Sequence, residues 1–183
     1  FDAATPSCYM SLCGVGVRLV EETGIGQIAP KDRESASEMA PFATARVLKR
    51  KKNPVVVIIA GRPSDTVSIA RINGFMQGLM EYGIFPTQTF NTDWAQASGE
   101  RSTFAAIKRF ETIDMLFTAS SLLSKGAVSA LTNKTRAKSI EHHSFDWNHT
   151  STDLTSDNSL TSAFGGHFIE TGLALVLLHD HYH

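Results

Sequence analysis

The chain has 183 residues, of which 42% are hydrophobic and 19% are charged, and its formal net charge at pH 7 is −1. This length is enough for one domain or two small subdomains with a buried core. The basic residues gather only at positions 49–52, so no nucleic-acid-binding surface is indicated.

Two cysteines are too few for a disulfide scaffold, and no apolar run approaches the roughly 20 residues needed to span a membrane. We therefore expect a reduced, cytoplasmic protein. Its start at Phe1 instead of Met is consistent with a fragment.

The first clear elements lie in the N-terminal half. Residues 15–22 predict a short helix and residues 25–29 a short strand, with glycines between them. Apolar residues recur at helical spacing over residues 35–50, and Asn53-Pro54 ends this helix. The continuous run VVVIIA at residues 55–60 is typical of a parallel strand that is covered on both faces. An amphipathic helix is predicted over residues 67–82, ended by Gly83.

The same alternation continues to the C-terminus. Strands are predicted over residues 87–90, 115–118, 139–145 and 160–164, and helices over residues 100–110, 121–131 and 167–178. Alternating strands and helices indicate an α/β fold with a parallel sheet and helices on both faces. Ligands of such sheets bind outside the carboxyl ends of the strands.

The residues at these strand ends carry several kinds of polar and aromatic side chain. A guanidinium, carboxylates, hydroxyls and indoles can together bind a polyol, because polar groups fix its hydroxyls and an aromatic face packs on its apolar side. The residues concerned are Arg71, Asp93, Trp94, Ser120, Ser121, Asp146 and Trp147.

Motifs of catalysis are absent from the sequence. It contains no phosphate-binding loop, GxGxxG, GxSxG or HExxH pattern. His142 and His143 are adjacent in a predicted strand, so their side chains point to opposite faces and cannot share a metal ion. The histidines of residues 179–183 are interpreted as part of a frayed tail in preference to a metal site. We expect no enzymatic activity, no cofactor and no bound metal.

Five segments occur in an order that resembles the effector-binding core of the lac/galactose repressor family of bacterial transcription regulators. The resemblance runs from about Gly26 to Asp180 and implies two Rossmann-like subdomains, each a parallel sheet flanked by helices, as in periplasmic binding proteins. It implies a partial N-subdomain over residues 1–52, a C-subdomain over residues 53–164, and a helix over residues 165–183 that returns to the N-subdomain. The segments are VVVIIAGRPSDTVSIARINGFMQGLMEYGI, NTDWAQASGERSTFAAI, MLFTASSLLSKGAVSAL, SFDWNHTSTDLTSDNSLTSAF and HFIETGLALVLLHD.

The resemblance also implies roles for single residues. Arg71 matches an arginine that hydrogen-bonds the effector, Asp146 an aspartate that accepts from effector hydroxyls, and Trp94 an aromatic that stacks on a sugar ring. Asp32 falls near a family aspartate at the start of a helix. The residues themselves leave alternatives open: Arg71 paired with Asp65 on the surface, Asp146 in a turn or cap, Trp94 half-buried in the core, and Asp32 as an N-cap.

Two departures from the family pattern concern the expected ligand site. Ser120 and Ser121 stand in place of the usual Asn-Asp pair, which predicts a wider pocket or one bridged by water. Trp147 replaces the second aspartate of an Asp-Asp pair, which removes a charge and adds an aromatic wall. We include Ser120 and Trp147 among the expected ligand-binding residues.

Three functions are compatible with these observations. The resemblance favours the ligand-sensing core of a homodimeric transcription regulator. A small effector, a sugar or a nucleoside-like molecule, would bind between the subdomains and control operator DNA binding by a headpiece that is not in this chain. A sugar-binding protein of an uptake system would share this architecture, and a small α/β enzyme using His142 or His143 is the third hypothesis. No membrane partner is expected.

Overall fold

The computed structural model describes residues 15–18, 27–131, 139–165 and 170–182. It divides the chain into two compact units, one formed by Phe1–Lys31 with His167–His183 and the other by Asp32–Gly166. In the smaller unit, β1 (Val15–Arg18) pairs antiparallel with β2 (Gln27–Pro30), and α7 spans Glu170–Tyr182. The helix predicted over residues 15–22 is therefore wrong at residues 15–18. Val15 and Val17 alternate with other residues, and such β-branched positions favour an extended strand once a partner strand is present.

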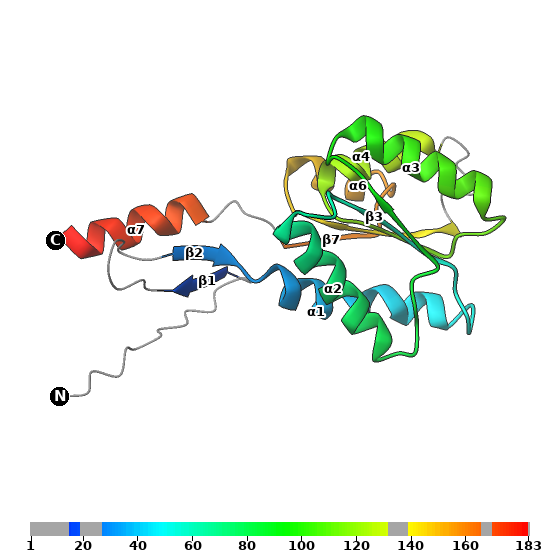
Figure 1. Cartoon of the computed structure of the whole chain (residues 1–183), viewed down its shortest axis with the longest axis horizontal. Coiled ribbons are helices and arrows are strands. Elements are labelled where there is room, and N and C mark those ends of the chain that lie inside the picture. Colours follow the sequence, from blue (N-terminus) through cyan, green and yellow to red (C-terminus); the bar gives the residue numbers. More distant parts are fainter. Residues whose placement is uncertain (1–14, 19–26, 132–138, 166–169, 183) are drawn as a thin grey trace. The chain divides into compact units, whose positions relative to one another are not determined.

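The larger unit is a five-stranded parallel sheet with helices on both faces (Figure 1). All four strand pairings are parallel, so the carboxyl ends of the strands lie at one edge, and the predicted α/β fold is confirmed. The strand order is β4-β3-β5-β6-β7, with β3 at Val56–Ala60, β4 at Gln88–Asn91, β5 at Met115–Thr118, β6 at Glu141–Phe145 and β7 at Ser162–Phe164. The helices are α1 (Asp32–Leu48), α2 (Thr66–Met80), α3 (Gln96–Arg109), α4 (Ser121–Ala130) and α6 (His149–Ser156). The sequence did not predict α6.

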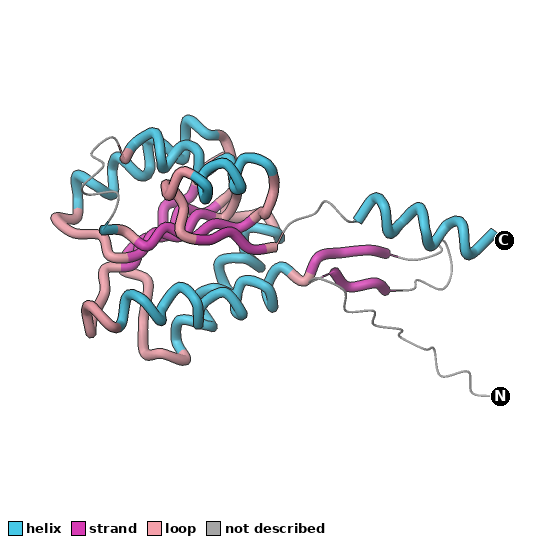
Figure 2. Tube along the Cα trace, turned by 180° about the vertical axis from the view of Figure 1, so that it is seen from behind, coloured by secondary structure: helices cyan, strands magenta, loops and turns pink. Residues whose placement is uncertain are grey.

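The central strand β3 is buried on both faces, as its unbroken β-branched run predicted. Val56, Ile58 and Ala60 pack in the core formed with α1 and α2, whereas Val57 and Ile59 pack in the core formed with α3 and α4. Figure 2 shows the sheet lying between these two helix layers. Successive side chains of a strand point to opposite faces, so a central strand without polar alternation requires both layers.

Helices α1 and α2 approach each other closely at a glycine. A Cβ atom at Gly74 would lie 2.1 Å from the backbone oxygen of Arg33, so any side chain at this position would push the helices apart. Gly74 lies three residues after Arg71 in α2, and Arg33 follows Asp32 in α1. This close contact therefore holds the side chain of Arg71 beside that of Asp32.

The boundary between the units differs from the expected one. We expected a C-subdomain over residues 53–164, but α1 belongs to the same compact unit as the parallel sheet, which begins at Asp32 and ends at Gly166. Ala36, Met39, Ala40 and Ala43 of α1 are completely buried in the core beneath the sheet. These apolar contacts explain why the larger unit begins at Asp32 and not at residue 53. None of the helices in the described ranges is both long and apolar enough to cross a membrane.

Candidate functional site

The carboxyl edge of the parallel sheet contains a point at which the strand order reverses. From β3 the chain passes to β4 on one side, and the next strand, β5, pairs with the other side of β3. The loops that follow β3 and β5 therefore diverge, one toward each helix layer, and ligands of such sheets generally bind at this point. Gly61 follows β3 and Ala119 follows β5, so these residues mark the place at which a binding site is expected.

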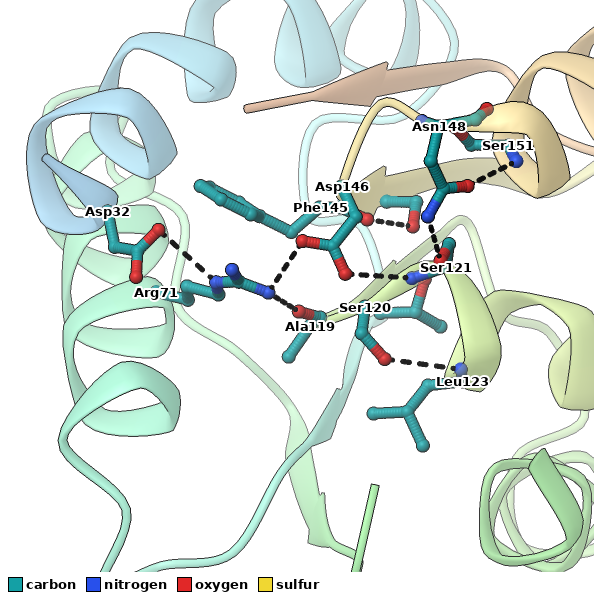
Figure 3. Close-up of polar contacts among 12 residues, drawn as sticks. Asp32, Arg71, Ala119, Ser120, Ser121, Leu123, Phe145, Asp146, Asn148 and Ser151 are labelled. Atoms are coloured by element: carbon teal, nitrogen blue, oxygen red, sulfur yellow. Dashed lines mark hydrogen bonds and ion pairs between the residues drawn. The ribbon is translucent and has the colours of Figure 1, made fainter. Parts of the chain in front are cut away.

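Arg71 of α2 reaches this reversal point and is almost completely buried, with 2% of its surface exposed. Its Nη1 donates a hydrogen bond to the backbone oxygen of Ala119 at 2.8 Å and lies 3.0 Å from Oδ1 of Asp146 (Figure 3). Its Nε lies 3.4 Å from Oδ1 of Asp32. The guanidinium also stacks over the ring of Phe145, 4.1 Å from the ring centre. Three chain segments and an aromatic ring thus fix the guanidinium in one place.

The two aspartates that pair with Arg71 both lie at helix N-termini. Asp32 is the first residue of α1, and Oδ2 of Asp146 accepts a hydrogen bond of 3.4 Å from the backbone N–H of Ser121, the first residue of α4. A helix N-terminus carries a partial positive charge that stabilises a carboxylate. Asp146 has φ of 70°, in the left-handed region that aspartate tolerates better than most residues. Arg71 and Asp146 therefore lie close together, as predicted. The alternative, a pairing of Arg71 with Asp65, is not observed.

Trp94 forms a second part of the edge and is held by Asp65. Its Nε1 donates to Oδ2 of Asp65 at 2.9 Å, and the other carboxylate oxygen of Asp65 accepts from the backbone N–H of Val67 at 3.1 Å, which caps α2. The indole lies against Gly61, where a Cβ atom would be 2.1 Å from the ring. The centre of the Trp94 ring is 6.0 Å from the guanidinium carbon of Arg71. An indole, a guanidinium and a carboxylate therefore meet at one edge of the sheet. Trp94 also packs against the core, so the half-buried alternative holds as well.

Replacing Asp65 by serine tests whether this carboxylate positions Trp94. Serine is an equally good N-cap, so we expect the free energy of unfolding to fall by less than about 1 kcal/mol. The shorter side chain cannot reach the indole, so the NMR signal of the Trp94 indole N–H should shift while that of Trp147 stays in place. Equal shifts of both indole signals, or of neither, would contradict the assignment.

Ser120 and Ser121 occupy the start of α4. The hydroxyl of Ser120 caps this helix by accepting from the backbone N–H of Leu123 at 3.3 Å, and the hydroxyl of Ser121 accepts from Nδ2 of Asn148 at 2.7 Å. Both hydroxyls are thus engaged within the chain, and contact of Ser120 with a ligand remains a prediction. Asn148 also begins α6 through a capping box with Ser151. Asn148 was not identified from the sequence. Its position three residues before Ser151 could have indicated a helix cap, but not the contact with Ser121.

Trp147 follows Asp146 but is not part of the cluster around Arg71. Its side chain is 65% exposed and makes no hydrogen bond or ring contact among the described residues. Asp93 precedes Trp94 and accepts hydrogen bonds from the hydroxyl of Ser98 and from the backbone N–H of Ala95. These bonds, the one from Ser98 foremost, lower the pKa of Asp93 below its usual value. The role of Trp147 as an aromatic wall of the ligand site stays a prediction.

His142 and His143 lie inside the unit, away from the edge. Nε2 of His142 is 3.3 Å from the hydroxyl of Thr118, and Nδ1 of His143 is 2.8 Å from the hydroxyl of Ser162. Burial lowers the pKa of His142 to about 4, and burial together with the charges of His142 and Arg46 lowers the pKa of His143 to about 3. Both imidazoles are therefore neutral at pH 7. No group of three or more potential metal ligands is gathered within the described ranges. Of the terminal histidines, His179 is exposed in α7, and His183 lies outside those ranges.

No protein-family model and no curated protein matches this sequence. Solved structures of similar fold exist. A periplasmic solute-binding protein of an ABC transporter from Actinobacillus succinogenes, solved with bound D-allose, has a TM-score of 0.71 at 17% identity over 81% of this chain and 52% of its own. The fructose-binding periplasmic domain of a hybrid two-component system has a TM-score of 0.68 at 18% identity over 82% of this chain and 51% of its own. A dimeric lac repressor has a TM-score of 0.60 at 19% identity over 72% of this chain and 46% of its own.

These similarities show that the fold is that of periplasmic binding proteins. The three proteins described above comprise two solute-binding proteins or domains and a repressor. None of these three is named as an enzyme. The chain spans about half the length of these three proteins. A second half of the fold is thus present in each of them beyond the part that this chain matches.

Proposed function

We propose that this chain is part of a two-subdomain ligand-binding protein and that a small polyol, most simply a sugar, binds at the carboxyl edge of its parallel sheet. The observation that carries the proposal is the buried guanidinium of Arg71, which Ala119, Asp146 and Asp32 fix at the reversal point of the strand order. Carboxylate oxygens and an indole beside a fixed guanidinium are suited to hydroxyl groups and to the apolar face of a sugar ring.

We further propose that the ligand regulates transcription. The five collinear segments that resemble the lac/galactose repressor family support this function, and a lac repressor is among the proteins of similar fold. Ligand binding would favour one relative orientation of two subdomains in a cytoplasmic homodimer. The affinity of a headpiece for operator DNA would change by the same factor by which DNA changes the affinity for the ligand.

The uptake function is the second candidate. It is favoured by the solute-binding protein with D-allose and by the fructose-binding periplasmic domain, both of which have higher TM-scores than the lac repressor. A transported solute requires no operator. The two functions therefore differ in one measurable property, namely whether DNA and ligand affect each other's affinity.

Calorimetric titration of the purified protein with a panel of neutral sugars and nucleosides tests the binding site. A ligand that binds should lose at least about tenfold in affinity on Arg71→Lys, because lysine keeps the charge but not the planar fork of donors. Arg109→Lys is the matched control, since Arg109 is exposed in the last turn of α3. Equal affinities of the Arg71→Lys variant and the unaltered protein would refute the site.

A titration of the full-length protein with genomic operator fragments, in the presence and in the absence of ligand, separates the two functions. Regulation predicts that ligand shifts the midpoint of DNA binding, and transport predicts that no DNA fragment binds at all. Enzymatic activity is not proposed, and the burial of His142 and His143 supports this view because neither imidazole reaches the edge where a ligand would bind.

A further inference from the structure

Several backbone N–H groups at the carboxyl edge, at or just before helix starts, already donate to carboxylates of the chain itself. Asp65 accepts from the backbone N–H of Val67 at the start of α2, and Asp93 accepts from that of Ala95 immediately before α3. Asp146 accepts from the N–H of Ser121 at the start of α4. Figure 3 shows Asp146 between this helix start and Arg71. Asp32, the first residue of α1, lies on the other side of Arg71.

This arrangement weakens the usual means of binding an anion at the starts of α2 and α4. Unoccupied N–H groups at a helix N-terminus attract phosphates and carboxylates. Here one N–H group in the first turn of α2 and one in the first turn of α4 donate to carboxylates, as does the N–H of Ala95 just before α3, so an anion near them would have to approach a carboxylate. The edge therefore offers mainly acceptors, which suit the hydroxyl hydrogens of a polyol.

The charge of the inner cluster acts in the same direction. Asp32 and Asp146 have 5% and 18% of their side-chain surfaces exposed, and Arg71 between them has 3%. Arg71 thus pairs with a carboxylate on each side, and these ion pairs are poorly screened because the three side chains are largely buried. Arg33 and Arg62 near this edge are exposed, so water and salt screen them.

We infer that the site selects uncharged polyols and rejects their acidic derivatives, such as sugar phosphates and uronates. The inference rests on the proposed function, because it names the chemical class of ligand for the same site. Arg71 alone would suggest the opposite class, since an arginine is a common partner of carboxylates and phosphates. Its pairing with Asp32 and Asp146 is the reason why it does not act in this way.

Matched pairs of ligands test the inference on the purified protein. Calorimetry should compare D-glucose with D-glucuronate and D-glucose 6-phosphate, D-galactose with D-galacturonate, and D-ribose with D-ribose 5-phosphate. For any pair in which the neutral sugar binds, the anion should bind about tenfold or more weakly at low ionic strength. Added salt should narrow this difference only slightly, because the charges of the cluster are largely buried and poorly screened.

An Asp146→Asn variant locates the source of the selectivity. Asparagine keeps the size of the side chain, tolerates positive φ and can still accept from the N–H of Ser121, so the fold should persist. The ratio of neutral to anionic affinity should fall several-fold. Glu81→Gln is the control with the same change of charge. Glu81 follows the last residue of α2 and lies ten residues beyond Arg71, thus roughly 15 Å along the helix, and its variant should leave the ratio unchanged.

The outcomes separate this inference from the proposed function. An anion that binds as tightly as its neutral partner, or tighter, overturns the inference while Arg71-dependent binding of a small polyol still holds. An unchanged affinity ratio in the Asp146→Asn variant also overturns it. If no compound of either kind binds, or if binding is insensitive to Arg71→Lys, the proposed function fails and the inference fails with it.

Discussion

An Arg71→Met variant is expected to unfold with a free energy about 3–5 kcal/mol lower than that of the unaltered protein. Arg71 is the cation that compensates the charges of Asp32 and Asp146, and all three side chains are largely buried. Methionine fills most of the volume, so loss of packing contributes little. The cost arises because two carboxylates remain in a poorly solvated place after the guanidinium that pairs with both of them is removed. Urea denaturation followed by circular dichroism measures this difference.

Neutralising the carboxylates provides the control for this variant. Asp32→Asn and Asp146→Asn each remove one of the two charges, so adding either substitution to Arg71→Met should recover part of the lost stability. A double-mutant cycle should accordingly give a coupling energy of about 1–3 kcal/mol between Arg71 and each aspartate. A loss of less than about 1 kcal/mol in Arg71→Met would show that the cluster does not stabilise the fold. The cluster would then be open to a purely ligand-binding role.

The fold could be predicted because its strands carry strong local patterns. The run VVVIIA is typical of a strand covered on both faces, and β3 is buried at every residue. Arg71 could be placed at the carboxyl edge for the same reason, since it follows such a strand by a short loop. The prediction of residues 15–22 as a helix was wrong for the opposite reason. Four residues of β1 carry little periodicity, and a distant partner strand, β2, decides their conformation.

The details of the site depend on contacts that local patterns do not encode. Asp65 was considered as a partner of Arg71, yet it accepts from Trp94, which lies 29 residues away in the sequence. Asp32 was an ordinary N-cap candidate, and its pairing with Arg71 depends on the close approach of α1 and α2 at Gly74. Only the packing of the helices determines which of several acidic residues meets Arg71. The residue types were predictable, but their pairing was not.

Stability should also fall as the pH is lowered from 7.5 to 5, by about 4 kcal/mol for the two buried histidines together. The pKa values of His142 and His143 in the folded protein are lowered to about 4 and about 3. Their value in the unfolded chain is about 6.5. Between these limits the unfolded state binds protons that the folded state does not. The stabilisation is therefore fully present above pH 6.5, and it decreases by about 1.4 kcal/mol per histidine for each pH unit below it.

Single substitutions assign this pH dependence to the buried imidazoles. His142→Gln and His143→Gln should each remove about half of the slope of stability against pH between 6.5 and 5, whatever their effect on stability at pH 7.5. His149→Gln is the control, because the side chain of His149 is 93% exposed. This pH window lies above the range in which ordinary carboxylates titrate, so Asp93, whose pKa is lowered, does not contribute. Stability that is constant from pH 7.5 to 5 would mean that the imidazoles accept protons in the folded state. A charge would then be tolerated inside the sheet, between the two helix layers, and the assignment of both histidines to a neutral interior would have to be abandoned.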